Sequence, residues 1–208
     1  MDNRSWLQPL TGVLFIVVLI AGFAIGGEPP DATEDSVQEV IDFYVDNENE
    51  VFIGGILQAI GGALLIFFGG YLYKRLRAAG AEASAGVAFA GLIALAVAIA
   101  LDGTISIALT ELANGDEEPS EGAVQALNVL WNNDFLPLAM GISVFLWGAG
   151  VAIVRHGGLP TWMGWVVIVA AITAISPAFP VAAIVAALLV LVSSIVFSMQ
   201  ERSGETGT

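Results

Sequence analysis

The sequence contains no cysteine, one histidine and only six lysine and arginine residues in 208 positions. Without cysteine the chain can form neither a disulfide nor a thiolate metal site, and with one histidine it cannot ligate haem through a histidine pair. Charged residues make up 12% of the chain, whereas hydrophobic residues make up 57% and the mean hydropathy is +0.83. A soluble domain of this length needs far more polar surface, so the composition predicts a membrane protein.

Long apolar runs predict six transmembrane helices, because about 20 apolar residues in a helix cross a hydrocarbon core of ~30 Å. We expect these spans over residues 6–27, 51–73, 85–109, 135–154, 160–176 and 181–199. The alternating strands of ~10 residues that build membrane barrels are not seen in the sequence. The predicted fold is all-α: a polytopic six-transmembrane-helix bundle forming one domain over residues 1–200, with a disordered cytoplasmic tail over 201–208.

The basic residues all fall on one side of these six predicted helices. They are Arg4, Lys74, Arg75, Arg77, Arg155 and Arg202. Cytoplasmic loops are enriched in lysine and arginine, so we expect a bacterial plasma-membrane protein with both termini in the cytoplasm. A signal peptide is the alternative for the first run, with cleavage near Ala24-Ile25-Gly26, and it would place the mature N-terminus outside.

The acidic residues number 20, and only Asp2, Glu82, Glu201 and Glu205 share the basic side. The predicted outer face is therefore strongly acidic and repels nucleic acid and anionic headgroups. The basic side consists of short turns, and we expect little room for a site there. Any functional site is predicted on the acidic face.

Two short amphipathic helices are predicted in the long outer loops. Ser36 and Glu39 have the spacing of a capping box, and apolar residues then recur at helical spacing from Val37 to Val45. Ser120 can begin a second helix with an apolar side that ends at Trp131. A packing lid over the bundle is the favoured interpretation, and a partner-binding surface is the alternative.

Glycine pairs punctuate the second predicted span at Gly54-Gly55, Gly61-Gly62 and Gly69-Gly70. Their spacing aligns them as one stripe along a helix. Small residues let membrane helices approach closely, so the stripe predicts tight helix packing in preference to a flexible conduction path.

Asp102 is the most informative acidic residue, because it falls near the outer end of the third predicted span. An ionised Asp costs roughly 2.5–3.5 kcal/mol at the bilayer centre and less near the interface, and such residues often mark ion or proton pathways. The favoured interpretation is a carboxylate solvated at the interface. The hypothesis is that Asp102, Asn132, Asn133 and Asp134 line an outward-facing polar pocket beneath the amphipathic helices.

The sequence offers little for enzymatic chemistry. His156 is predicted on the cytoplasmic side, away from the outer polar residues, and neither an H-E-x-x-H zinc motif nor a phosphate-binding loop occurs. We therefore predict no enzymatic activity, catalytic residue, metal or cofactor. The leading expectation is a structural or interaction role, with the lipid bilayer and a membrane or extracytoplasmic protein as partners. The alternative is a small ion or proton transporter or channel that uses the pocket near Asp102.

Two local motifs resemble a known family. Leu159-Pro160-x-Trp162-x-Gly164-Trp165 opens the fifth predicted span, and Ala126-Leu127-Asn128 shortly precedes Asp134-Phe135-x-Pro137. They resemble an actinobacterial-type family of small multi-span integral membrane proteins of unknown function, over most of the chain. The resemblance implies a membrane fold and supplies no reaction, substrate or functional residue.

Overall fold

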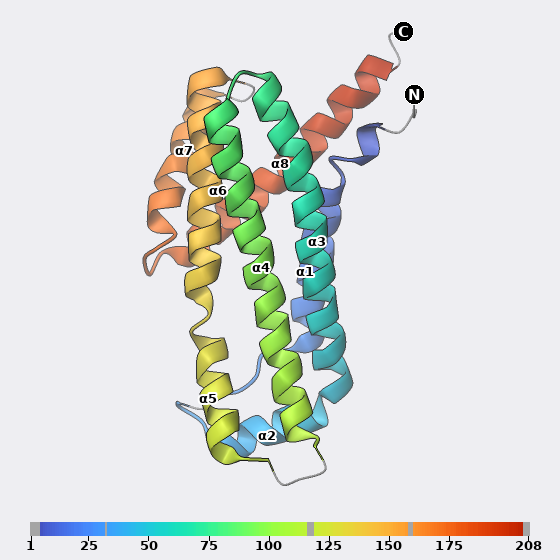
Figure 1. The fold of residues 1–208 in the computed structure, drawn as a ribbon, viewed down its shortest axis with the longest axis vertical. Coiled ribbons are helices and arrows are strands. Elements are labelled where there is room, and N and C mark those ends of the chain that lie inside the picture. The colour runs from blue at the N-terminus through green and yellow to red at the C-terminus, as the bar shows by residue number, and fades with distance from the viewer. Residues whose placement is uncertain (1–4, 32, 116–118, 158–159, 206–208) are drawn as a thin grey trace.

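The computed structural model describes residues 5–31, 33–115, 119–157 and 160–205, and this part of the chain is helical with connecting turns and loops (Figure 1). The elements are η1 (Ser5–Leu7), α1 (Thr11–Gly26), α2 (Val37–Asp46), α3 (Glu48–Ala78), α4 (Glu82–Ala113), α5 (Glu121–Asn132), α6 (Phe135–His156), α7 (Thr161–Thr173) and α8 (Phe179–Glu205). The predicted all-α class is confirmed.

Four helical segments of the described chain are long and apolar enough to cross a membrane by length and composition. They are Glu48–Ala78, Glu82–Ala113, Glu121–His156 (α5 with α6) and Phe179–Ser203. The apolar helices α1 and α7 are shorter, with 16 and 13 residues. At 1.5 Å per residue, α7 reaches only about 20 Å. The four long segments indicate a membrane-embedded protein.

The long helices α3, α4 and α6 lie side by side, with α1 against α3 and α7 against α6 (Figure 1). One end of the bundle carries α2 and α5, and we call it the acidic end. The opposite end carries the chain termini and the α3–α4 and α6–α7 turns, and we call it the basic end. Helix α8 crosses the bundle obliquely and diverges from α6 towards the basic end.

Glycines bring α3 close to two neighbours at once. A Cβ added to Gly54 would lie 2.8 Å from the carbonyl oxygen of Gly22 on α1, and one added to Gly55 would lie 2.8 Å from the carbonyl oxygen of Gly103 on α4. Successive helix residues point about 100° apart, so the two members of a pair serve different neighbours. The predicted close packing is present, but on two faces of α3 rather than along one stripe.

Both predicted outer helices are present, and together α2 and α5 form what we call the cap. The capping box of α2 is complete: Ser36 Oγ accepts from the Glu39 N–H at 3.3 Å, and Glu39 Oε2 accepts from the Ser36 N–H at 3.0 Å. Helix α5 follows Ser120, whose side chain makes no capping hydrogen bond within the described chain. The apolar faces of α2 and α5 pack together with the end of α4 through buried Val40 and Val124.

The C-terminal segment differs from the prediction. Helix α8 continues to Glu205, so residues 201–205 are helical rather than disordered. The rest of the predicted tail, residues 206–208, lies outside the described chain, as does Arg4 at the N-terminus. The Glu201 carboxylate accepts a hydrogen bond of 2.8 Å from the Tyr71 hydroxyl on α3. This tertiary contact stabilises a segment whose polar composition alone indicated disorder.

Candidate functional site at the acidic end

The Asp102 side chain is 5% exposed and lies on α4, about three turns before the C-terminal end of that helix. Gln58 on α3, Trp131 on α5 and Asp134 just before α6 are close enough to interact with its carboxyl group. Tyr44 on α2 is 1% exposed and lies within the electrostatic reach of Asp102. Asp102 is therefore buried beneath the cap and not solvated at an interface as we expected.

The glycine contact between α3 and α4 explains why Gln58 adjoins Asp102. Gly103 has no side chain, and a Cβ added there would lie 2.9 Å from Gln58 Oε1 and 2.8 Å from the Gly55 carbonyl oxygen. The two backbones can thus approach at the level of Asp102. Gln58 itself is 6% exposed, so the close approach seals its amide inside the bundle.

Buried polar atoms without hydrogen-bond partners gather around Asp102. Among the described residues these atoms are Tyr44 Oη, Gln58 Oε1, Asp102 Oδ2, Trp131 Nε1 and Asp134 Oδ2. A buried polar atom without a partner costs roughly 1–3 kcal/mol, so native proteins seldom tolerate several in one place. We refer to these five residues as the Asp102 cluster. Their arrangement is one that a proton, a water molecule or a small cation would complete.

The charge of the cluster depends on its two carboxyl groups. Two ionised carboxylates at close range in a low-dielectric interior repel each other, and no Lys or Arg faces them, because every described basic residue lies at the basic end. Burial, and secondly the charge of Asp102, raise the pKa of the Tyr44 phenol, which therefore stays protonated. Neutralisation of the pair must come from a bound proton or cation.

Two hollows of different size border Trp131. A small cavity of about 20 Å³, the size of one water molecule, adjoins Tyr44, Gln58 and Trp131. Next to it, an open depression of about 530 Å³ also borders Trp131 and is lined by the carboxylates of Glu28, Asp31, Asp35 and Glu39. This acidic depression attracts cations and repels anions, so it favours positively charged species on the outer side of Trp131.

Asp31 stays anionic in this depression. Its carboxylate accepts hydrogen bonds from the Thr33 backbone N–H at 2.8 Å and the Thr33 hydroxyl at 2.7 Å, and these bonds hold the Asp31 pKa below its usual value. Asp35 Oδ2 accepts from the Asp31 backbone N–H at 3.1 Å. The α1–α2 loop therefore presents fixed negative charge beside the cluster.

The four residues predicted to line one pocket do not all lie together in the structure. Asp102 and Asp134 are brought together. Asn132 borders the acidic depression, and its amide donates to Asn128 Oδ1 at 3.3 Å. Asn133 is exposed, and its amide donates to the Val129 carbonyl oxygen at 2.8 Å, so it lies apart from the cluster.

Sequence reasoning missed Tyr44, Gln58 and Trp131 as members of the cluster. Tyr44 lies on the apolar face of α2, and a tyrosine in that position is typical of a packing residue. Asn128 was also missed: it is fully buried and donates to the Pro30 carbonyl oxygen at 3.1 Å, which fixes the α1–α2 loop on α5. A polar residue on the otherwise apolar side of α5 was the available signal.

The Asp102 cluster offers few ligands for a metal ion. Within the described residues, no group of three or more His, Asp or Glu side chains is placed to hold a metal ion. His156 lies at the basic end beside Gly80, at the other end of the bundle from the Asp102 cluster. The cluster offers two carboxyls, an amide oxygen and a phenol, which suit a proton or one small cation better than a multi-carboxylate metal centre.

An all-helical bundle with apolar helices of membrane-spanning length and a buried carboxyl pair defines a membrane-embedded protein with a polar site. The chain belongs to the family described as Domain of unknown function (DUF4386), whose model matches residues 10–203. No curated protein and no solved structure matches the chain.

Proposed function

We propose that the protein is a non-enzymatic plasma-membrane protein with an interaction role, and that binding of a proton or small cation at the Asp102 cluster controls its cap. The observation that carries this proposal is the meeting, where cap and bundle join, of five buried polar atoms that have no hydrogen-bond partner within the described part of the chain. With the carboxyl pair neutralised, the closed cap buries Tyr44 and Trp131 at low cost. With both carboxylates charged, repulsion and desolvation favour an open cap.

Six spans with both termini in the cytoplasm form part of this proposal. The four long segments would be joined by α1 and α7, and all described Lys and Arg residues would face the cytoplasm. The cap then lies outside the cell, where it is accessible to an extracytoplasmic or membrane protein partner. The bilayer thins or the flanking residues snorkel around helices as short as α7.

The residue types at the cluster support a role without catalysis. A nucleophilic enzyme needs a serine or other nucleophile beside a base, and the single histidine lies at the opposite end of the bundle. The cluster instead places acids, an amide and two aromatic side chains at the contact between the cap and the helix bundle. This composition suits binding and switching.

A transporter or channel for protons or ions is the second candidate. The buried Asp102–Asp134 pair favours it, because acids within membrane helices often mark ion pathways. Tight packing argues against an open path in this conformation: added Cβ atoms at Gly91 and Gly141 would lie within 2.2 Å of the Phe145 nitrogen and 2.6 Å of the Leu95 nitrogen. Proton or cation flux into proteoliposomes that is abolished in Asp102→Asn would establish this candidate instead.

Cysteine accessibility tests the proposed cap. Val124 is 1% exposed beneath the cap and Leu130 on the same helix is 54% exposed, so Val124→Cys and Leu130→Cys give a buried and an exposed label site in a chain with no native cysteine. The maleimide labelling rate of the first, divided by that of the second, corrects for the pH dependence of thiol reactivity. We expect this ratio to be low in acid and to increase as the pH rises.

The neutral variant Asp102→Asn provides the control. It keeps the shape of the side chain and removes one charge, so the ratio should stay low at every pH. Added monovalent salt should lower the ratio at high pH in the unmodified background if a cation substitutes for the proton. An unchanged pH dependence in Asp102→Asn would show that the cluster does not control the cap.

A further inference from the structure

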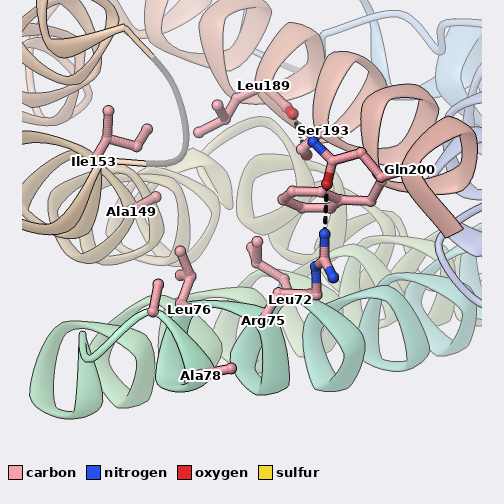
Figure 2. Close-up of a pocket in the computed structure, with 12 residues that line it drawn as sticks. Leu72, Arg75, Leu76, Ala78, Ala149, Ile153, Leu189, Ser193 and Gln200 are labelled. Atoms are coloured by element: carbon pink, nitrogen blue, oxygen red, sulfur yellow. Dashed lines mark hydrogen bonds between the residues drawn. The ribbon is translucent and has the colours of Figure 1, made fainter. Parts of the chain in front are cut away.

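An apolar slot of about 350 Å³ opens at the basic end, between the ends of α3 and α6 and the diverging α8 (Figure 2). Its walls include Leu72 and Leu76 from α3, Ile153 from α6 and Leu189 from α8. The expectation that this side has little room for a site is therefore wrong. The slot exists because α8 leaves the bundle at an angle, so its C-terminal half does not fill the space beside α6.

The polar groups of the slot are concentrated at one edge. Ser193 is 3% exposed, but its hydroxyl donates to backbone carbonyl oxygens of α8 one turn earlier, so it presents little polarity to the slot. Arg75 and Gln200 hydrogen-bond to each other across the edge, from α3 to α8 (Figure 2). The slot thus combines a hydrocarbon-like interior with a cationic rim.

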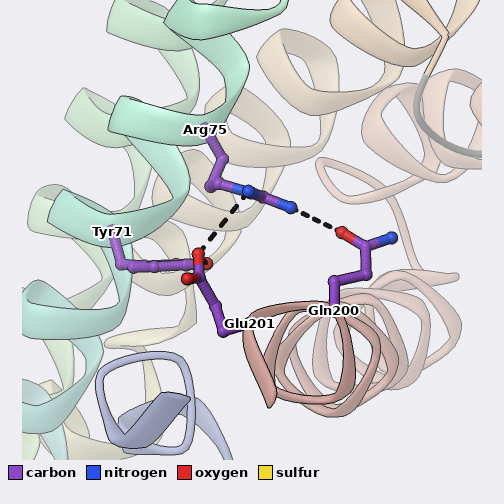
Figure 3. Close-up of polar contacts among 4 residues, drawn as sticks. All are labelled: Tyr71, Arg75, Gln200 and Glu201. Atoms are coloured by element: carbon purple, nitrogen blue, oxygen red, sulfur yellow. Dashed lines mark hydrogen bonds and ion pairs between the residues drawn. The ribbon is translucent and has the colours of Figure 1, made fainter. Parts of the chain in front are cut away.

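Arg75 is incompletely neutralised. Its Nη1 lies 3.5 Å from Glu201 Oε1, which is also the acceptor of the 2.8 Å hydrogen bond from Tyr71 (Figure 3). A guanidinium favours two parallel, short bonds to an anion, and a single 3.5 Å contact falls short of that geometry. The guanidinium carbon also lies 5.2 Å from the centre of the Phe197 ring, which holds it over the slot.

We propose that this slot binds an anionic phospholipid from the leaflet at the basic end, with an acyl chain in the slot and the phosphate at Arg75. The apolar walls select hydrocarbon over water, and the cationic rim selects a negative headgroup. Of the two other basic residues at this end of α3, Lys74 is exposed and Arg77 is paired with Glu82 at 3.0 Å. This site depends neither on the proposed orientation in the membrane nor on the Asp102 cluster.

Native mass spectrometry of the full chain in detergent tests this site with phosphatidylglycerol and phosphatidylcholine of identical acyl chains. We expect phosphatidylglycerol to bind more tightly, and Arg75→Gln to weaken it roughly tenfold, as expected for losing one charge-assisted contact. Arg155→Gln removes the same charge at the same end but outside the slot, so it should leave the affinity unchanged. Equal losses in the two variants would overturn the site.

A second variant keeps the proposal testable if Arg75→Gln fails to fold. Glu201→Gln removes the carboxylate that competes for Arg75, so it should increase phosphatidylglycerol binding without affecting phosphatidylcholine. Ala78 borders the slot at an exposed position, and Ala78→Phe should reduce binding of both lipids by filling it. Equal binding of the two lipids, or no response to Glu201→Gln, would reduce the slot to a nonselective hydrocarbon contact and overturn the proposal.

Discussion

The two ends of the molecule differ in whether their polar side chains have partners. At the basic end, the Glu201 carboxylate accepts a hydrogen bond from Tyr71 and lies 3.5 Å from Arg75, and an apolar slot beside these residues stays open. At the acidic end, Asp102 is buried and Asp134 is half-buried, and the Oδ2 atom of each has no partner among the described residues. A paired network stabilises the fold as it stands, whereas an unpaired one makes the fold depend on what binds there.

The largest effect should come from the packed region that separates the ends. A Cβ added to Gly91 of α4 would lie 2.2 Å from the Phe145 nitrogen of α6, so Gly91→Leu must force the two helices apart. We expect a loss of about 3 kcal/mol in stability, measured by denaturation of the purified protein in mild detergent. Gly70→Ala, where nothing lies within 4 Å, is the matched control and should be neutral or stabilising. Equal losses would show that the ends are not separated by close packing.

Removing the hydroxyl of one buried tyrosine at each end allows the stability contributions of the two ends to be compared. The Tyr71 hydroxyl donates to a carboxylate at the basic end, so Tyr71→Phe should cost about 1.5 kcal/mol, read from the same denaturation curves. The Tyr44 hydroxyl has no partner among the described residues at the acidic end, so Tyr44→Phe should cost little or stabilise the protein. A larger loss at Tyr44 would mean that its hydroxyl is already satisfied by a bound species.

The smallest effect concerns the two helices of the cap. Ser36→Ala removes a complete capping box and should cost about 1 kcal/mol of cap stability, visible as faster hydrogen exchange of the α2 amides. Ser120→Ala removes a side chain that makes no capping bond within the described chain, so exchange of the α5 amides should barely change. If Ser120→Ala has the larger effect, the two caps differ in the opposite sense.

Local features of the fold could be predicted from the sequence, and tertiary ones could not. The start of α2 follows from Ser36 and Glu39, because a capping box is a contact within four residues. The helical C-terminal segment was missed because it depends on Glu201 meeting Tyr71, 130 positions away. Hydropathy also predicted a longer fifth span than the 13 residues of α7, because apolar turn residues after Thr173 raise the hydropathy without extending the helix.

The candidate site shows the same division. Asp102 and Asp134 could be selected as unusual acids near the same face, and the structure brings them together. The burial of Asp102 could not be predicted, because it depends on where Gly55 and Gly103 let α3 and α4 meet. The slot beside Arg75 depends on the angle of α8, which no pattern along the chain encodes. The crossing angle of two helices depends on how the side chains at their contact pack together.

Helix α8 has a mechanical consequence that neither end reveals alone. Its first residue, Phe179, packs on Phe135, the residue after Asp134, with 6.4 Å between ring centres, and its last turns hold Arg75. Between these contacts, a Cβ added to Gly12 of α1 would lie 2.2 Å from Ser194 Oγ, so the two helices touch closely at one crossing. A helix of 27 residues is a stiff rod of about 40 Å. Because α8 also packs against α6, α7 and η1, it connects the residues beside Asp134 to those that border the slot.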